Sequence, residues 1–312
     1  MEQTFKQYLE SHGKSKTTVK HYNAYILDFL SYLDRDRTEV ENATAKEVLS
    51  YLNILQKRGQ ENKTRTIRLN VIKQFFNYQI TLNQREDNPV SHLKIRGSKK
   101  HKLHQILDKQ ELESLYTNYQ VPTENDPLKT RNWFTTYRLS KARNKTIISL
   151  LINQGLTTPE VAKLTLNDLQ LKEGTIKIQG SRKSNERILE LKSNQIMELM
   201  EYQYTTRTEL LKYQTNETKN LFLTTPTAGK EKATGSGNLQ IFKGLTKELK
   251  SQNKSFVNFK QVRASVITHW LKEHNLRQAQ YMSGHRYVSS TEKYLVNQIE
   301  DLQTDIDAFH PF

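Results

Sequence analysis

The sequence predicts a mainly α-helical protein with a small β-sheet, divided into an N-terminal helical domain and a C-terminal α+β domain. The chain has 312 residues, enough for two domains, with only 11 glycines and 6 prolines, a composition that favours helices. Apolar residues recur at helical spacing along most of the chain, whereas two short stretches near its middle alternate as strands do. A basic segment around residue 100 has neither pattern, and we place the domain boundary there.

The first domain, residues 1–96, is expected to contain four or five helices. Its most regular apolar stripe has helical period and consists of Val19, Tyr22, Ile26, Phe29, Leu30 and Leu33. Thr44 and Glu47 are spaced as a capping box at the start of a later helix. Asn88 and Pro89 end the domain, because the residue before a proline avoids helical backbone.

Residues 94–104 are basic, with one glycine and no periodicity. We therefore predict a linker at 97–107 between the two domains. A flexible basic connection suits a clamp that closes around a polyanion, since each phosphate contact adds salt-dependent affinity. A plain disordered connector would have a similar composition.

The second domain, residues 108–312, begins with Asp108 as a helix cap. A polar excursion follows at 118–132, and an apolar helix is expected from Ala142 to Gln154. Residues 175–179 and 187–191 alternate as strands on either side of a turn, which predicts a β-hairpin. Further helices are expected at 192–219 and 239–249, separated by a loop at 224–238.

Charge and composition limit the classes of function. The chain carries 48 Lys and Arg against 33 Asp and Glu, a net charge of +15, which favours nucleic acid as partner over an anionic membrane surface. It has no cysteine, which excludes disulfides, cysteine nucleophiles and cysteine-ligated zinc. No apolar run approaches the ~18 residues of a spanning helix, and the first residues do not read as a secretory signal. We expect a soluble, intracellular protein.

The stretch 260–294 combines three chemically capable side chains. Arg263 lies in the middle of a helical apolar stripe, where a guanidinium is costly unless an anion pairs with it. A second helix is expected from 276 to 283, with Gly284 as its end and His285 directly after. Ser289 and Glu292 would cap a third helix that carries Tyr294 in its first turns. The ordinary alternatives are a carboxylate partner for the arginine, a histidine that is merely satisfied, and a core or surface tyrosine.

This stretch resembles the C-terminal signature of the tyrosine recombinase family, the phage integrases and Xer-like site-specific recombinases. The family's H-x-L-R box corresponds to residues 260–263, its L-G-H box to 283–285, and its nucleophile to Tyr294. Arg263 and His285 match the family pattern, whereas Lys260 replaces the first histidine. The resemblance implies that Tyr294, Arg263, His285 and Lys260 are catalytic.

The family's first box, T-G-L-R-x-x-E-L-x-x-L, resembles residues 154–164. Gly155, Leu156, Glu160 and Leu164 fit, but Thr157 stands where the family has a catalytic arginine. Losing such a preorganised cation can cost a few kcal/mol of transition-state stabilisation. Either another cation such as Lys260 or Arg182 takes its place, or the chain is slow, or it no longer cuts DNA.

The hairpin resembles the family hairpin whose turn carries a lysine that protonates the leaving 5′ oxygen. Lys183 is the expected general acid and Arg182 the neighbouring alternative, which is otherwise a DNA contact. A basic turn that only touches the DNA backbone remains possible. The first domain resembles the family's core-binding (SAM-like) domain, which implies backbone contacts from Lys63, Arg65, Arg68 and Lys73. An ordinary solvated face would carry similar residues.

The resemblance therefore implies a site-specific DNA recombinase or integrase that cuts and rejoins DNA through a 3′-phosphotyrosyl intermediate. It implies double-stranded DNA as partner, a dimer on one site and a homotetramer on two, with no metal, no cofactor and no membrane. A cytoplasmic protein, nucleoid-associated when bound, is expected, and its acidic tail after Tyr294 would pack on a neighbouring protomer or on its own domain. The alternatives are a non-catalytic DNA-binding relative and a relaxing enzyme similar to type IB topoisomerases.

Overall fold

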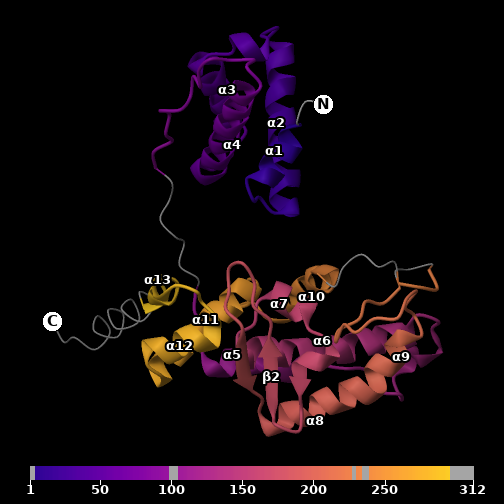
Figure 1. The fold of residues 1–312 in the computed structure, drawn as a ribbon. Helices are drawn as coiled ribbons and strands as arrows, with labels where there is room; N and C mark the ends of the chain where they lie inside the picture. Colours follow the sequence, from indigo (N-terminus) through magenta and orange to yellow (C-terminus); the bar gives the residue numbers. More distant parts are fainter. Residues whose placement is uncertain (1–3, 98–104, 227–229, 234–238, 296–312) are drawn as a thin grey trace, which may run out of the picture. The chain divides into compact units, whose positions relative to one another are not determined.

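The structure is a computed structural model, and it describes residues 4–97, 105–226, 230–233 and 239–295. The chain forms two compact units, Met1–Lys102 and Leu103–Phe312 (Figure 1). Each unit has its own hydrophobic core. The division between the units falls within the linker expected at 97–107. The tail after Tyr294, whose packing was predicted from the sequence, lies outside the described residues from residue 296 onward.

The first unit is a bundle of amphipathic helices in which α4 packs against α1, α2 and α3. Its elements are α1 (Phe5–Ser11), α2 (Lys16–Arg35), the 3₁₀ turn η1 (Val40–Asn42), α3 (Ala45–Lys57) and α4 (Asn62–Thr81). Thr44 and Glu47 form the expected capping box at the start of α3. Most of the predicted stripe on α2 is buried, including Val19 and Phe29, because these positions recur on one helical face.

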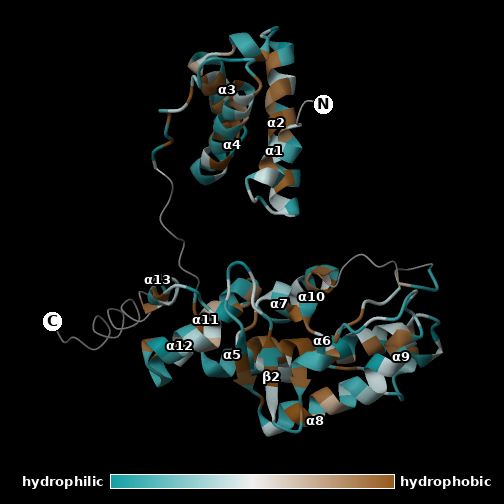
Figure 2. Ribbon diagram, viewed as in Figure 1, coloured by the Kyte–Doolittle hydropathy of each residue, from teal (hydrophilic) through white to brown (hydrophobic). Residues whose placement is uncertain are grey.

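The second unit is mostly helical. Its helices are α5 (Lys109–Thr117), η2 (Pro127–Thr130), α6 (Phe134–Gln154), α7 (Thr158–Lys163), η3 (Leu166–Asp168), α8 (Ser193–Glu201), η4 (Tyr202–Thr206), α9 (Arg207–Leu211), α10 (Leu239–Gln252), α11 (Phe259–Glu273), α12 (Leu276–Ser283) and α13 (Val288–Glu292). The last three lie together at one end of the unit in Figure 1. The hydropathy colouring in Figure 2 shows hydrophobic residues gathered around β2 and α6.

A three-stranded antiparallel sheet, in the order β1-β2-β3, completes this unit. Its strands are β1 (Leu169–Gln170), β2 (Thr175–Ile178) and β3 (Arg187–Glu190). The predicted hairpin is confirmed, with Ile176 opposite Leu189 and Ile178 opposite Arg187. Strand β1 was missed because two residues are too few to display a period.

Several predicted helix bounds in this unit are wrong. Helix α6 begins at Phe134 rather than Ala142. Its early turns bury Lys141 and Arg143 together with apolar side chains, and these charges hide the apolar stripe in the sequence. The helical region after residue 192 ends at Leu211 rather than at 219 and contains a turn of π-helix. Among the described residues, no helix is long and apolar enough to cross a membrane.

Candidate active site

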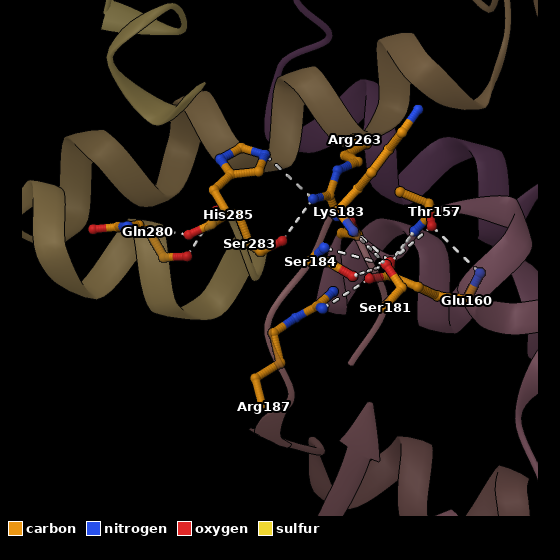
Figure 3. Close-up of polar contacts among 11 residues, drawn as sticks. Thr157, Glu160, Ser181, Lys183, Ser184, Arg187, Arg263, Gln280, Ser283 and His285 are labelled. Carbon is orange, nitrogen blue, oxygen red and sulfur yellow. Dashed lines mark hydrogen bonds and ion pairs between the residues drawn. The ribbon is translucent and has the colours of Figure 1, made fainter. Parts of the chain in front are cut away.

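Arg263 lies on the inner face of α11 and holds three chain segments together. Its side chain is 12% exposed. It donates hydrogen bonds to the carbonyl oxygens of Gly155 (2.5 Å) and Ser283 (2.6 Å), and Nη2 lies 3.4 Å from Nε2 of His285 (Figure 3). The Glu160 carboxylate is 3.8 Å from Nη1. The costly core arginine predicted from the sequence is therefore stabilised by carbonyl groups and one nearby carboxylate.

His285 follows the end of α12, where Gly284 has a left-handed backbone (φ 69°), as predicted. Its Nδ1 lies 2.9 Å from the Thr291 hydroxyl. Burial, the Arg263 guanidinium and the Arg187 guanidinium together lower the pKa of His285 to about 4. The imidazole is therefore neutral near pH 7.

This pKa predicts a pH dependence of stability. Because the pKa of His285 falls from 6.5 to about 4 on folding, the unfolded chain binds more protons between these values. The free energy of unfolding should therefore decrease as the pH is lowered from 6.5 towards 4. In urea titrations at pH 7 and pH 5, His285→Gln should show a smaller decrease than the wild type; an equal decrease would contradict the assignment.

Tyr294 lies beside this histidine. Its ring stacks on that of His285, with centroids 5.8 Å apart and planes inclined by 10°. The predicted start of the third helix is wrong: α13 begins at Val288 after the N-cap Tyr287. Tyr294 consequently follows the helix instead of lying in its first turns, and its backbone N–H donates to the Thr291 carbonyl.

The hairpin turn is fixed against the same segment. Its ends are closed by hydrogen bonds between Ser181 and Ser184, both backbone and side chain. The Asn185 N–H donates to the Gly284 carbonyl (2.9 Å), and the backbone of Ser184 pairs with that of His285 in an isolated antiparallel β-bridge. These bonds anchor the turn that carries Arg182 and Lys183, both of which are exposed.

A pocket of about 690 Å³ collects most of the candidate residues. Its lining includes Thr157, Lys183, Lys260, Arg263 and His285. Lys260 and Lys183 are exposed, so their ammonium groups are accessible to a bound anion. The structure thus brings together four of the five predicted catalytic residues, and Tyr294 joins them through its stack on His285.

Thr157, at the position of the missing arginine, has a structural role. It is the N-cap of α7, and its N–H and hydroxyl both donate to Glu160 Oε2 at 2.8 Å. The other Glu160 oxygen accepts a hydrogen bond from Nη1 of Arg187 at 2.8 Å. Burial disfavours the Glu160 carboxylate, but the hydrogen bond and charge of Arg187, with smaller contributions from the Thr157 N–H and the Arg263 charge, outweigh it and lower its pKa.

Sequence reasoning missed Arg187. Its side chain is fully buried at the start of β3. A signal was available, because Arg187 and Leu189 are two residues apart and must face the same side of the strand. An arginine on an inward-facing strand position requires an anion, and Glu160 supplies it.

The residues expected to touch DNA from the first unit differ in placement. Lys63 is exposed. The expectation for Arg65 is corrected, because it is buried and its guanidinium donates to the Leu52 carbonyl and to Asn62.

Arg68 and Lys73, which were also expected to contact DNA, form polar contacts inside the first unit. Arg68 forms an ion pair with Asp28 and donates to the Tyr51 hydroxyl, and Lys73 donates to the carbonyls of Ser91 and Leu93. Their polar groups stabilise contacts between helices and the segment after them. The basic side chains of α4 therefore do not all face solvent, because several of them form bonds inside the unit.

A cluster of three or more His, Asp or Glu side chains suited to a metal does not occur among the described residues. Among the charged residues that line the pocket, Lys and Arg outnumber Asp and Glu by four to two, which suits an anion such as a phosphate.

The fold and the basic residues of the pocket suit a protein that acts on a phosphate-bearing polymer, and comparison with known families identifies the class. Residues 105–300 match the Phage integrase family, and residues 2–85 match the phage integrase N-terminal SAM-like domain. The chain therefore belongs to the phage integrase family of tyrosine recombinases, which are DNA strand-transferring enzymes.

Relatives and solved structures resemble it over nearly its full length. It is 24% identical to tyrosine recombinase XerA of Pyrococcus furiosus over 93% of this chain and 87% of that protein. It is 25% identical to tyrosine recombinase XerD of Listeria innocua over 96% of this chain and 94% of that protein. Among structures, the Tn1549 transposon integrase bound to transposon right end DNA has a TM-score of 0.63 at 14% identity, covering 98% of both chains. A lambda integrase tetramer bound to a Holliday junction has a TM-score of 0.62 at 15% identity, covering 93% of this chain and 74% of that one.

Proposed function

We propose that this chain is a site-specific recombinase that cleaves double-stranded DNA through Tyr294. The observation that carries the proposal is the contiguous group formed by Arg263, His285 and Tyr294 beside a pocket lined with cations. The Tyr294 oxygen attacks a phosphorus atom and passes its phenolic proton to water. The bond to the 5′ oxygen breaks, and a 3′-phosphotyrosyl link forms. This link retains the energy of the phosphodiester bond, so rejoining needs no nucleotide.

The charge that builds on the phosphate oxygens needs fixed donors. Arg263 is held by the carbonyls of Gly155 and Ser283, so its guanidinium is preorganised for one non-bridging oxygen. Neutral His285 can donate one hydrogen bond from an imidazole nitrogen. Lys260, exposed at the rim of the pocket, places a further positive charge where relatives of the family carry histidine.

Lys183 is our choice for the general acid. The leaving 5′ oxygen requires a proton, and an ammonium group can give one up, whereas an arginine guanidinium does not deprotonate in proteins. Lys183 lines the pocket. This chemistry favours Lys183 over the adjacent Arg182, which we assign to backbone contact together with Lys63.

A substrate with a better leaving group tests this choice. Lys183→Ala should cleave an ordinary duplex about 100-fold more slowly, since general acid catalysis contributes on this scale. It should recover most of its rate on a duplex whose scissile 5′ oxygen is replaced by sulfur, because a thiolate leaves without protonation. The measurement is the single-turnover cleavage rate on both duplexes, with Arg182→Ala as the control. If Arg182→Ala, and not Lys183→Ala, recovers its cleavage rate on the sulfur-substituted duplex, Arg182 is the general acid.

We further propose that a dimer binds one DNA site and a homotetramer joins two. The support is analogy: a lambda integrase with this fold was solved as a dimer on a core site and as a tetramer on a Holliday junction. Exchange between two duplexes needs paired cleavages, which a single active site cannot provide.

Plasmids with two, one or no target sites test the proposal. A recombinase should produce deletion or inversion products only from the two-site plasmid. Relaxation of a plasmid without any site would favour a topoisomerase-like enzyme. Binding to the site with no strand exchange would favour a DNA-binding relative that has lost catalysis with the arginine at position 157.

A further inference from the structure

We propose that Arg187 compensates for the arginine missing at position 157, by pairing with Glu160 and so leaving the charge of Arg263 available to the scissile phosphate. The inference rests on the proposed function, since it concerns the same site. Arg187 is a positioning residue in this account. Its guanidinium is buried, and it acts on the phosphate through Arg263.

The geometry begins with Glu160, which interacts with both arginines. Nη1 of Arg187 lies 2.8 Å from Oε1, whereas Nη1 of Arg263 lies 3.8 Å from Oε2. Figure 3 shows Arg187 extending from β3 toward this carboxylate. Oε2 is already occupied by the N–H and hydroxyl of Thr157. The hydrogen bonds of Glu160 are therefore with Arg187 and with Thr157, the N-cap of α7, whereas its interaction with Arg263 is a longer and weaker ion pair.

The pairing of Glu160 with Arg187 determines the net charge beside the pocket. Glu160 contributes one negative charge, Arg187 and Arg263 contribute one positive charge each, and His285 is neutral near pH 7. The group therefore has a surplus of one positive charge beside the pocket. Without Arg187, the buried carboxylate would be left with Arg263 as its partner, and their charges would cancel. In a site of low dielectric, this loss would strongly weaken attraction of a phosphate.

The surroundings of Arg187 are arranged to admit it. A Cβ at Gly284 would overlap Nη1 and lie 2.9 Å from Cζ, so glycine is required there by space as well as by its positive φ. Within the described residues, Nε and Nη2 of Arg187 are buried without a hydrogen-bond partner. A guanidinium that keeps two donors unpaired incurs a cost, which is consistent with a site that retains charge at the expense of stability.

Lys260 and Arg182 are the other cations that could take the place of the missing arginine. Both are exposed, whereas the ion pairs of Glu160 within the described residues are with Arg187 and Arg263. Exposed cations can add to phosphate attraction, but screening by water and salt reduces their effect. Neutralising the buried carboxylate requires the buried guanidinium.

The test compares Arg187→Gln with Glu160→Gln. Each breaks the same ion pair, but the first leaves a negative charge beside Arg263 and the second removes it. We expect Arg187→Gln to lower the single-turnover rate of adduct formation at saturating DNA by about 100-fold, the scale for a lost electrostatic group. Glu160→Gln should lose much less, and the double variant should recover most of the loss of Arg187→Gln. Arg187→Lys, which keeps the charge, should lie between Arg187→Gln and the wild type.

A matched control is Arg207→Gln, since Arg207 is also buried and bonds the carbonyls of Thr218 and Asn220 away from the pocket. Its adduct rate should equal that of the wild type. Thermal unfolding of every variant separates lost folding from lost chemistry. Equal losses in Glu160→Gln and Arg187→Gln, or a wild-type rate in folded Arg187→Gln, would overturn the inference.

A readout without DNA keeps the inference separate from the proposed function. The charges recorded around His285 are Arg263 on α11, Arg187 on β3, Glu160 on α7 and Lys293. In an NMR titration, Arg187→Gln should raise the pKa of His285, and Glu160→Gln should lower it. If even the wild type forms no adduct, the proposed function fails, and these shifts still decide whether Arg187 balances Glu160; unchanged pKa values would refute it.

Discussion

Tyr294→Phe is expected to abolish the covalent DNA adduct and to leave DNA affinity close to that of the wild type. The substitution removes only the phenolic oxygen, which in our account is the nucleophile. The phenyl ring can keep the stack on His285, so the local structure should persist. Denaturing gels measure the adduct, and mobility shifts on the same duplex measure binding.

Tyr287→Phe is the matched control, because Tyr287 lies in the same segment and is 68% exposed. It should form adduct at the wild-type rate. An adduct that survives in Tyr294→Phe and disappears in Tyr287→Phe would move the nucleophile to the other tyrosine.

Arg263→Gln is expected to slow cleavage by about 10²–10³-fold, as loss of one preorganised donor typically does. The effect should be large because position 157 carries no second arginine to stabilise the charge on the phosphate. Some stability should be lost as well, since the carbonyls of Gly155 and Ser283 would lose a charged donor. Single-turnover cleavage and urea unfolding measure the two effects separately.

Arg277→Gln controls for the loss of one positive charge, because Arg277 is exposed on the neighbouring helix α12. It should change cleavage little at saturating DNA. Similar losses in Arg263→Gln and Arg277→Gln would mean that only the net charge of the unit matters, and would contradict a specific role for Arg263.

Much of the fold was predictable from sequence where local chemistry marks the ends of elements. Helix α12 has the bounds expected, 276–283, because Asn275 caps its start and Gly284 ends it. The hairpin was predicted because alternating residues flank a polar turn. Helix α13 was misplaced, because Ser289 and Glu292 resemble a capping box, whereas the helix begins one residue before Ser289 without a side-chain cap.

The candidate site was predictable only in part, because charges in its interior depend on partners far apart in sequence. The pairing of Arg187 with Glu160 joins residues 27 positions apart, and no local pattern connects them. The same limit explains Arg65, which looks like a surface cation in a helix but bonds the Leu52 carbonyl. The group of Arg263, His285 and Tyr294 was found because these residues resemble the family's C-terminal boxes in identity, order and spacing.

The central claim is that the chain still cuts DNA with threonine at position 157. The most direct measurement is to incubate the wild-type protein with nicked suicide duplexes carrying the sequences it binds, digest the product, and identify the modified peptide by mass spectrometry. We predict a nucleotide attached to Tyr294. Binding without any adduct would contradict the account and leave a DNA-binding relative that no longer cleaves.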